Sequence, residues 1–132
     1  MATIRSFEDL EAWKKARLLS KEIWKVSQVG TLSRDYKLKD QINSASGSAM
    51  DNIAEGFGRA GRTEFVNFLS IAKGSNDETK SQLYRALDRE HIDEENFNRL
   101  YALAEEVGKT INGLFEYLNK SNLKGVKFKD RV

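Results

Sequence analysis

Apolar residues recur at intervals of three or four in four segments of the chain. Such spacing aligns side chains along one face of a helix, because an α-helix completes a turn in about 3.6 residues. The clearest series alternates these two steps: Phe97, Leu100, Ala104, Val107, Ile111, Leu114 and Leu118. The four series predict helices over about residues 7–29, 36–57, 64–91 and 94–118.

Polar residues and glycines between these segments predict where the helices begin and end. Gly30 is placed to end the first helix. The expected N-caps are Ser6, then Ser33 or Asp35, then Thr63 and Asp93. The chain contains no proline, the residue that most often breaks helices. We therefore expect an all-α fold, an antiparallel up-down-up-down four-helix bundle over residues 1–119. A basic, flexible C-terminal tail is expected over residues 120–132.

The middle of the chain places small and polar residues where a core is expected. Ala45, Ala49 and Gly56 lie on the apolar line of the second helix, so a neighbouring helix can approach closely. Polar residues run beside this line and along the third helix: Ser48, Asn52, Glu55, Ser75, Asn76, Glu78 and Thr79. We predict that these seven residues form a polar layer between the two helices. The layer either sets helix register or a subunit contact, or it holds a ligand.

Charge is unevenly distributed although the net charge is only +2. Residues 1–62 hold 11 basic and 8 acidic side chains, residues 63–119 hold 6 and 11, and residues 120–132 hold 5 and 1. A basic region can bind a polyanion, although a mixed solvated surface is the simpler interpretation. The candidate nucleic-acid-binding residues are Lys14, Arg17, Lys21, Lys25, Arg59, Arg62, Lys124, Lys127 and Lys129.

The first helix carries apolar residues beyond its main stripe. Leu10 and Leu18 lie away from that stripe, and Trp13 and Trp24 lie on its flank. A helix with a second apolar face usually buries it in a further contact. We favour a solvated face with a subunit contact over a nucleic-acid surface for this helix.

Little in the sequence points to catalysis or to a bound cofactor. Gly56, Gly58 and Gly61 match G-x-G-x-x-G, but a dinucleotide site needs a preceding strand, and here a helix precedes the glycines. The chain has no cysteine and one histidine, His91, which we assign to the dipole at a helix end. Glu55, Arg59 and Glu78 are the only charged set considered for acid–base work. We predict a protein that is not an enzyme, with no catalytic residue, metal or cofactor.

Two short motifs in the second and third helices resemble those of a known family. They are Asn52-Ile53-Ala54-Glu55-Gly56 and Ala72-x-Gly74-Ser75-x-x-Glu78, and they follow Phe7-x-x-Leu10 and Trp13. In these residues the chain resembles the bacterial four-helix-bundle proteins encoded by intervening sequences in 23S rRNA genes. The resemblance implies a homo-oligomer, a pentamer. It extends distantly to the accessory variability proteins of retroelements, which are barrel-shaped pentamers that bind nucleic acid and a reverse transcriptase.

The sequence therefore leaves two functions open. One is a homo-oligomeric bundle that binds RNA or DNA through its basic surfaces. The other is a scaffold or adaptor that binds a protein partner through the exposed apolar residues of the first helix. The N-terminus has no apolar run, and no segment approaches the length of a membrane span. We therefore expect a cytoplasmic protein without a membrane partner.

Overall fold

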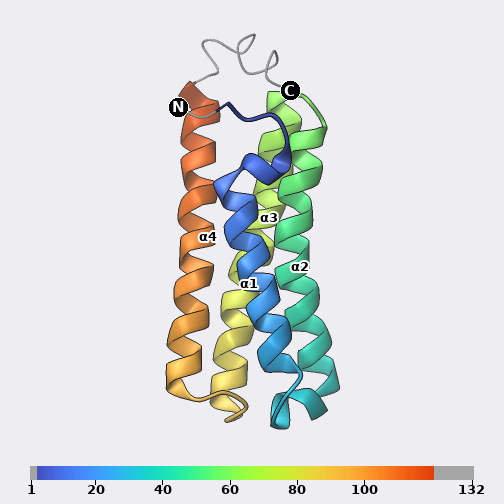
Figure 1. Ribbon diagram of the computed structural model, residues 1–132, viewed down its shortest axis with the longest axis vertical. Coiled ribbons are helices and arrows are strands. Elements are labelled where there is room, and N and C mark those ends of the chain that lie inside the picture. The colour runs from blue at the N-terminus through green and yellow to red at the C-terminus, as the bar shows by residue number, and fades with distance from the viewer. Residues whose placement is uncertain (1–2, 121–132) are drawn as a thin grey trace.

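Four α-helices account for most of residues 3–120, the part of the chain that the computed structural model describes (Figure 1). The helices are α1 (Glu11–Ser27), α2 (Tyr36–Gly58), α3 (Arg62–Asp88) and α4 (Glu94–Lys120). Two short 3-10 helices, η1 (Phe7–Asp9) and η2 (Thr31–Arg34), precede α1 and α2. No strand occurs within residues 3–120. The predicted all-α four-helix bundle is confirmed.

Each helix packs against two neighbours, with α1 and α3 on opposite corners. Polar contacts between α1 and α4 run in opposite order along the two helices: Lys15 contacts Glu106 at 3.3 Å, and Glu22 contacts Arg99 at 2.8 Å. The pairs between α2 and α3 show the same reversal, Gln41 with Arg85 and Ser48 with Ser75. Figure 1 shows successive helices running in opposite directions.

The N-terminal part of the first expected helix is a separate turn. The backbone N–H groups of Arg5 and Ser6 donate to the Asp9 carboxylate at 2.9 and 3.2 Å, which closes η1. Leu10 is then extended (φ −75°, ψ 127°), so α1 starts at residue 11 and not at residue 7. At its other end α1 stops at Ser27, before Gly30, which has a φ of +61° and begins η2.

Two of the expected caps lie where they were predicted. The Asp35 carboxylate accepts the Leu38 N–H at 3.3 Å, and the Asp93 carboxylate accepts the Asn96 N–H at 2.8 Å. Thr63 is not the cap of α3, because the extended Gly61 lets the helix begin at residue 62. The helix ends at residue 88, earlier than expected, and Glu90 follows with a φ of +58°.

The closest pair of helices is α2 and α3. A Cβ atom added to Gly56 would lie 2.6 Å from Cβ of Phe68 and 3.1 Å from a ring carbon of Phe65. No side chain fits in that space, so glycine is required for the observed separation of the helices. Most of the other core residues are aliphatic, such as the fully buried Leu19 and Ile53, and Phe57 and Phe97 add further aromatic rings. Within residues 3–120, none of the helices combines the length and hydrophobicity that crossing a bilayer requires.

Candidate interaction surfaces

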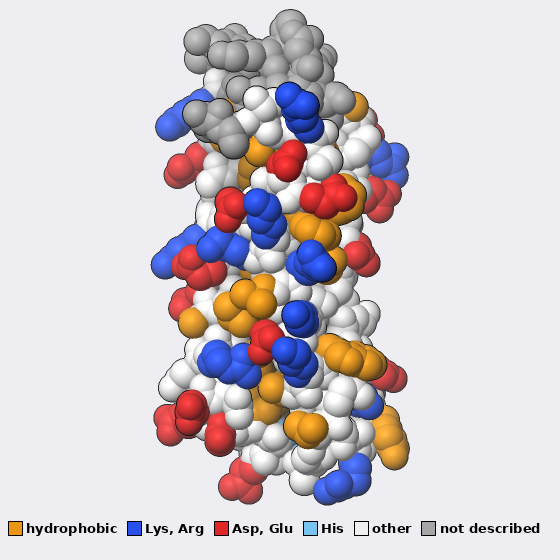
Figure 2. Space-filling view, in the orientation of Figure 1, with side chains coloured by type: hydrophobic (Ala, Val, Ile, Leu, Met, Phe, Trp, Pro, Cys, Tyr) orange, Lys and Arg blue, Asp and Glu red, His pale blue; other side chains and the backbone are white. Residues whose placement is uncertain are grey.

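The outward face of α1 combines basic and large apolar side chains. This α1 stripe consists of residues at helical spacing, all of them exposed: Lys14, Arg17, Leu18, Lys21, Trp24 and Lys25. Leu18 is 45% exposed and Trp24 is 55% exposed. In Figure 2, Lys and Arg side chains intermingle with hydrophobic ones on the face where α1 lies in front.

The cations of the α1 stripe differ in how far they are neutralised. Lys14 pairs with Glu11 at 3.3 Å and Lys25 pairs with Glu22 at 3.4 Å. Among residues 3–120, Lys21 has no acidic partner, and the Arg17 guanidinium lies 5.6 Å from the Trp13 ring.

Helix α1 also has the largest excess of positive charge among the helices, with five basic and two acidic side chains. The Arg99 guanidinium, followed by the Lys25 ammonium, holds the pKa of the Glu22 carboxyl below its ordinary value. Glu22 is therefore a carboxylate near neutral pH. It neutralises part of the positive charge of the α1 stripe.

Of the other predicted basic residues, Arg59 and Arg62 do not extend this stripe. Arg59 forms an ion pair with Glu55 at 2.8 Å and lies 5.1 Å from the Phe68 ring, so it belongs to the α2–α3 edge. The Glu55 carboxylate raises the pKa of Arg59. Arg62 is half-buried at the first position of α3. The remaining three candidates, Lys124, Lys127 and Lys129, lie outside the described residues.

Three residues of the predicted polar layer lie together. The Ser48 and Ser75 hydroxyls are 3.0 Å apart across α2 and α3. The Asn52 amide donates to the Ser48 hydroxyl at 3.0 Å and to its carbonyl at 2.8 Å. A shallow pocket of about 370 Å³ lies beside this group, lined by Asp40, Gln41, Ser44, Ala45, Ser48, Ser75 and Glu78.

The other four residues of that prediction have different partners. Asn76 is buried and donates to the Ala104 carbonyl of α4 at 2.8 Å, so it joins α3 to α4 rather than to α2. Thr79 donates to the Ser75 carbonyl within its own helix at 2.9 Å. Glu55 is exposed beside its Arg59 partner. Glu78 accepts from Gln82 at 3.5 Å at the pocket rim.

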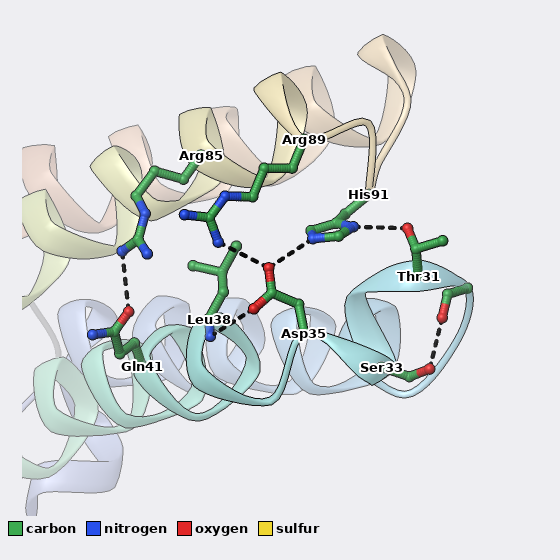
Figure 3. A network of polar contacts seen from close by, with 9 residues as sticks. Thr31, Ser33, Asp35, Leu38, Gln41, Arg85, Arg89 and His91 are labelled. Atoms are coloured by element: carbon green, nitrogen blue, oxygen red, sulfur yellow. Dashed lines mark hydrogen bonds and ion pairs between the residues drawn. The ribbon is translucent and has the colours of Figure 1, made fainter.

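A polar network that the sequence did not predict joins two connections at one end of the bundle (Figure 3). One Asp35 carboxylate oxygen lies 2.8 Å from Arg89 and 2.8 Å from Nε2 of His91. Nδ1 of His91 lies 2.7 Å from the Thr31 hydroxyl, so the imidazole bridges η2 and the α2 cap. The His91 contact, followed by the Arg89 contact, lowers the pKa of Asp35 to about 2.

His91 thus joins the α1–α2 and α3–α4 connections through polar contacts, and it does more than interact with the dipole at a helix end. The available sequence signal was topological: residues 30–35 and 89–93 both connect helices at the same end of an up-down bundle. Nothing in the spacing indicated which side chains would meet there.

No group of three or more His, Asp or Glu side chains within residues 3–120 is arranged to hold a metal ion. Glu55, Arg59 and Glu78, the residues named above for acid–base work, do not share one set of contacts. Glu55 pairs with Arg59, whereas Glu78 contacts Gln82. The fold and its surfaces define a four-helix-bundle protein whose most distinctive exposed feature is the basic and apolar face of α1.

The family model of the 23S rRNA-intervening sequence protein matches residues 8–113. The match covers most of the chain, so the protein belongs to this family, and the resemblance seen in the sequence motifs is confirmed.

Among solved structures, the chain is similar to a protein of unknown function from the S23 ribosomal protein family of Bacteroides thetaiotaomicron. The TM-score is 0.71 at 22% sequence identity, and the alignment covers 78% of this chain and 96% of that chain. At this identity the likeness shows the fold alone. No curated protein matches the chain. The family is of unknown function and shows no sign of catalytic activity.

Proposed function

We propose that the protein is a non-enzymatic homo-oligomer, a pentamer, that binds RNA or DNA through the α1 stripe. The observation that carries this proposal is the interleaving of four cations with exposed Leu18 and Trp24 on one helix face. Cations at this spacing neutralise successive phosphates, and an exposed indole stacks on unpaired bases. The name of the family, which refers to 23S rRNA, is consistent with an RNA partner.

Exposed apolar residues on other helices support self-assembly without use of the α1 stripe. Ile71 of α3 is 52% exposed and Tyr36 of α2 is 72% exposed. Large apolar side chains exposed on several faces favour contacts between subunits. The assembly is tested by its solution mass after nuclease treatment, which should be about five times the 15.0 kDa subunit mass.

Charge reversal in the α1 stripe tests nucleic-acid binding. The double variant Arg17→Glu/Lys21→Glu should weaken binding to a structured RNA by at least roughly tenfold at ~50 mM salt, and should reduce the salt slope by about two. The matched control is Lys73→Glu/Lys109→Glu, which makes the same change of charge on α3 and α4. Equal loss in both variants, or no binding by the wild type at this salt concentration, would reject the proposal.

A second substitution separates stacking from charge. Trp24→Ala should weaken binding to single-stranded RNA by about 1–3 kcal/mol and should leave binding to duplex RNA nearly unchanged, because only unpaired bases stack on a side chain. Fluorescence anisotropy with both RNAs measures this difference.

The alternative function is a scaffold that binds a protein partner. It is favoured by the same exposure of Leu18 and Trp24, because large apolar side chains surrounded by charge are typical of protein-binding surfaces. A pull-down that returns only nucleic acid would count against the scaffold. Loss of a nuclease-resistant partner in a Leu18→Ala/Trp24→Ala variant would favour it.

A further inference from the structure

A cavity of about 560 Å³ lies between the N-terminal segment and the last turns of α4. Its lining includes the buried Leu10, Phe57 and Phe65 and the half-buried Ile4 and Leu114. Both ends of the described chain lie at this end of the bundle (Figure 1). A volume of this size is typical of sites that enclose a ligand or a short peptide segment, for which the usual range is roughly 300–1,000 Å³.

The chain leaves α4 beside this cavity. Residues of the last turns of α4 line it, from Thr110 to Tyr117, and the helix ends at Lys120. Twelve residues follow and lie outside the described part of the chain. An extended chain rises roughly 3.3 Å per residue, so these residues can turn back over the ~15 Å of helix between Thr110 and Lys120.

The sequence of these twelve residues suits a cavity that is lined mainly by apolar side chains and has one excess carboxylate at its edge. Leu123, Val126 and Phe128 alternate with basic residues. The charged residues that line the cavity are Asp9, Glu11 and Lys14, and the Lys14 ammonium pairs with the Glu11 carboxylate at 3.3 Å, so the excess negative charge is that of Asp9. Backbone N–H groups of Arg5 and Ser6 lower the pKa of Asp9, which keeps its carboxylate ionised.

We propose that residues 121–132 fold back and insert Val126 and Phe128 into this cavity, with a neighbouring lysine near the Asp9 carboxylate. The apolar side chains would leave water for a lining of Leu10, Phe57 and Leu114. Lys124, Lys127 and Lys129 would then be held against the end of the bundle. The proposal does not depend on nucleic-acid binding.

Disulfide formation between engineered cysteines tests this docking in the full chain. The chain has no natural cysteine, so any disulfide must come from the engineered pair. Gly113 lines the cavity, and a Cβ atom added there meets nothing within 4 Å, so Gly113→Cys is accommodated. Its partner is Val126→Cys. The control pair is Gly47→Cys with Val126→Cys, because Gly47 is a helical glycine with the same open surroundings away from the cavity.

Under mild oxidation the Gly113→Cys/Val126→Cys chain should form an intramolecular disulfide at least roughly tenfold faster than the control pair, because docking raises the local thiol concentration. Adding Phe128→Asp should lower the rate roughly tenfold, since burial of one aromatic side chain shifts a docking equilibrium by about that factor. Equal rates for the two pairs, no effect of Phe128→Asp, or predominantly disulfide-linked dimers would overturn the proposal.

Discussion

Two glycines of α2 should respond in opposite ways to the same substitution. At Gly56 a new Cβ atom would lie 2.6 Å from Cβ of Phe68, an atom fixed to the backbone of α3. The Gly56→Ala variant must therefore push the two helices apart, because no rotation of a side chain relieves this contact. At Gly47, in the same helix, a Cβ atom meets nothing within 4 Å.

The magnitudes follow from the two environments. Overpacking of a filled core costs about 1–3 kcal/mol, and alanine returns up to ~1 kcal/mol of helix propensity. We expect Gly56→Ala to lower the free energy of unfolding by about 1–2 kcal/mol. Gly47→Ala has only the second effect and should raise it by about 0.5–1 kcal/mol.

Urea unfolding followed by far-UV circular dichroism measures both changes. With the usual dependence of about 1–3 kcal/mol per molar urea, the midpoints of the two variants should differ by about 1 M. All samples should have the same protein concentration, because assembly makes apparent stability concentration-dependent. If Gly56→Ala were as stable as Gly47→Ala, the inference that glycine is required for close α2–α3 packing would be wrong.

Two further predictions concern buried or bridged polar groups. The pKa of Asp35 is lowered from 3.8 to about 2, so its contribution to stability is complete above pH 3.8 and is lost as the pH falls through 2. The difference in free energy of unfolding between the wild type and Asp35→Asn, measured by urea unfolding, should become smaller as the pH falls over that interval. A difference that stays constant would contradict the stabilisation of the Asp35 carboxylate by its network. The control is Asp51→Asn, at an exposed position. Asn76→Asp should cost several kcal/mol, because it places a carboxylate in the core against the Ala104 carbonyl. The exposed substitution Asn67→Asp should cost almost nothing in the same assay, and equal costs would refute the argument.

Helix positions were predictable from the sequence because the spacing of apolar residues is a local property. The alternating series from Phe97 to Leu118 needs no information about other helices to define its buried face, and all but one of its residues are buried in the bundle. Cap chemistry is also local, which is why Asp35 and Asp93 were found.

Contacts between helices were harder to predict. Asn76 was expected to face α2, but it donates to Ala104 of α4. A modest rotation of α3 decides between the two neighbours, and that rotation depends on how every side chain of the core packs. The contact between Asp35 and His91 joins residues 56 positions apart, so no local pattern could indicate it.

The close approach of α2 and α3 has a consequence for how the chain folds. These helices are consecutive, and only residues 59–61 separate them. Closing so short a loop costs little entropy, so this hairpin can form before distant segments meet. We expect it to act as the folding nucleus, onto which the N-terminal helix and the last helix condense. Substitutions in the contact between α2 and α3 should slow refolding, whereas substitutions in α1 and α4 should mainly speed unfolding.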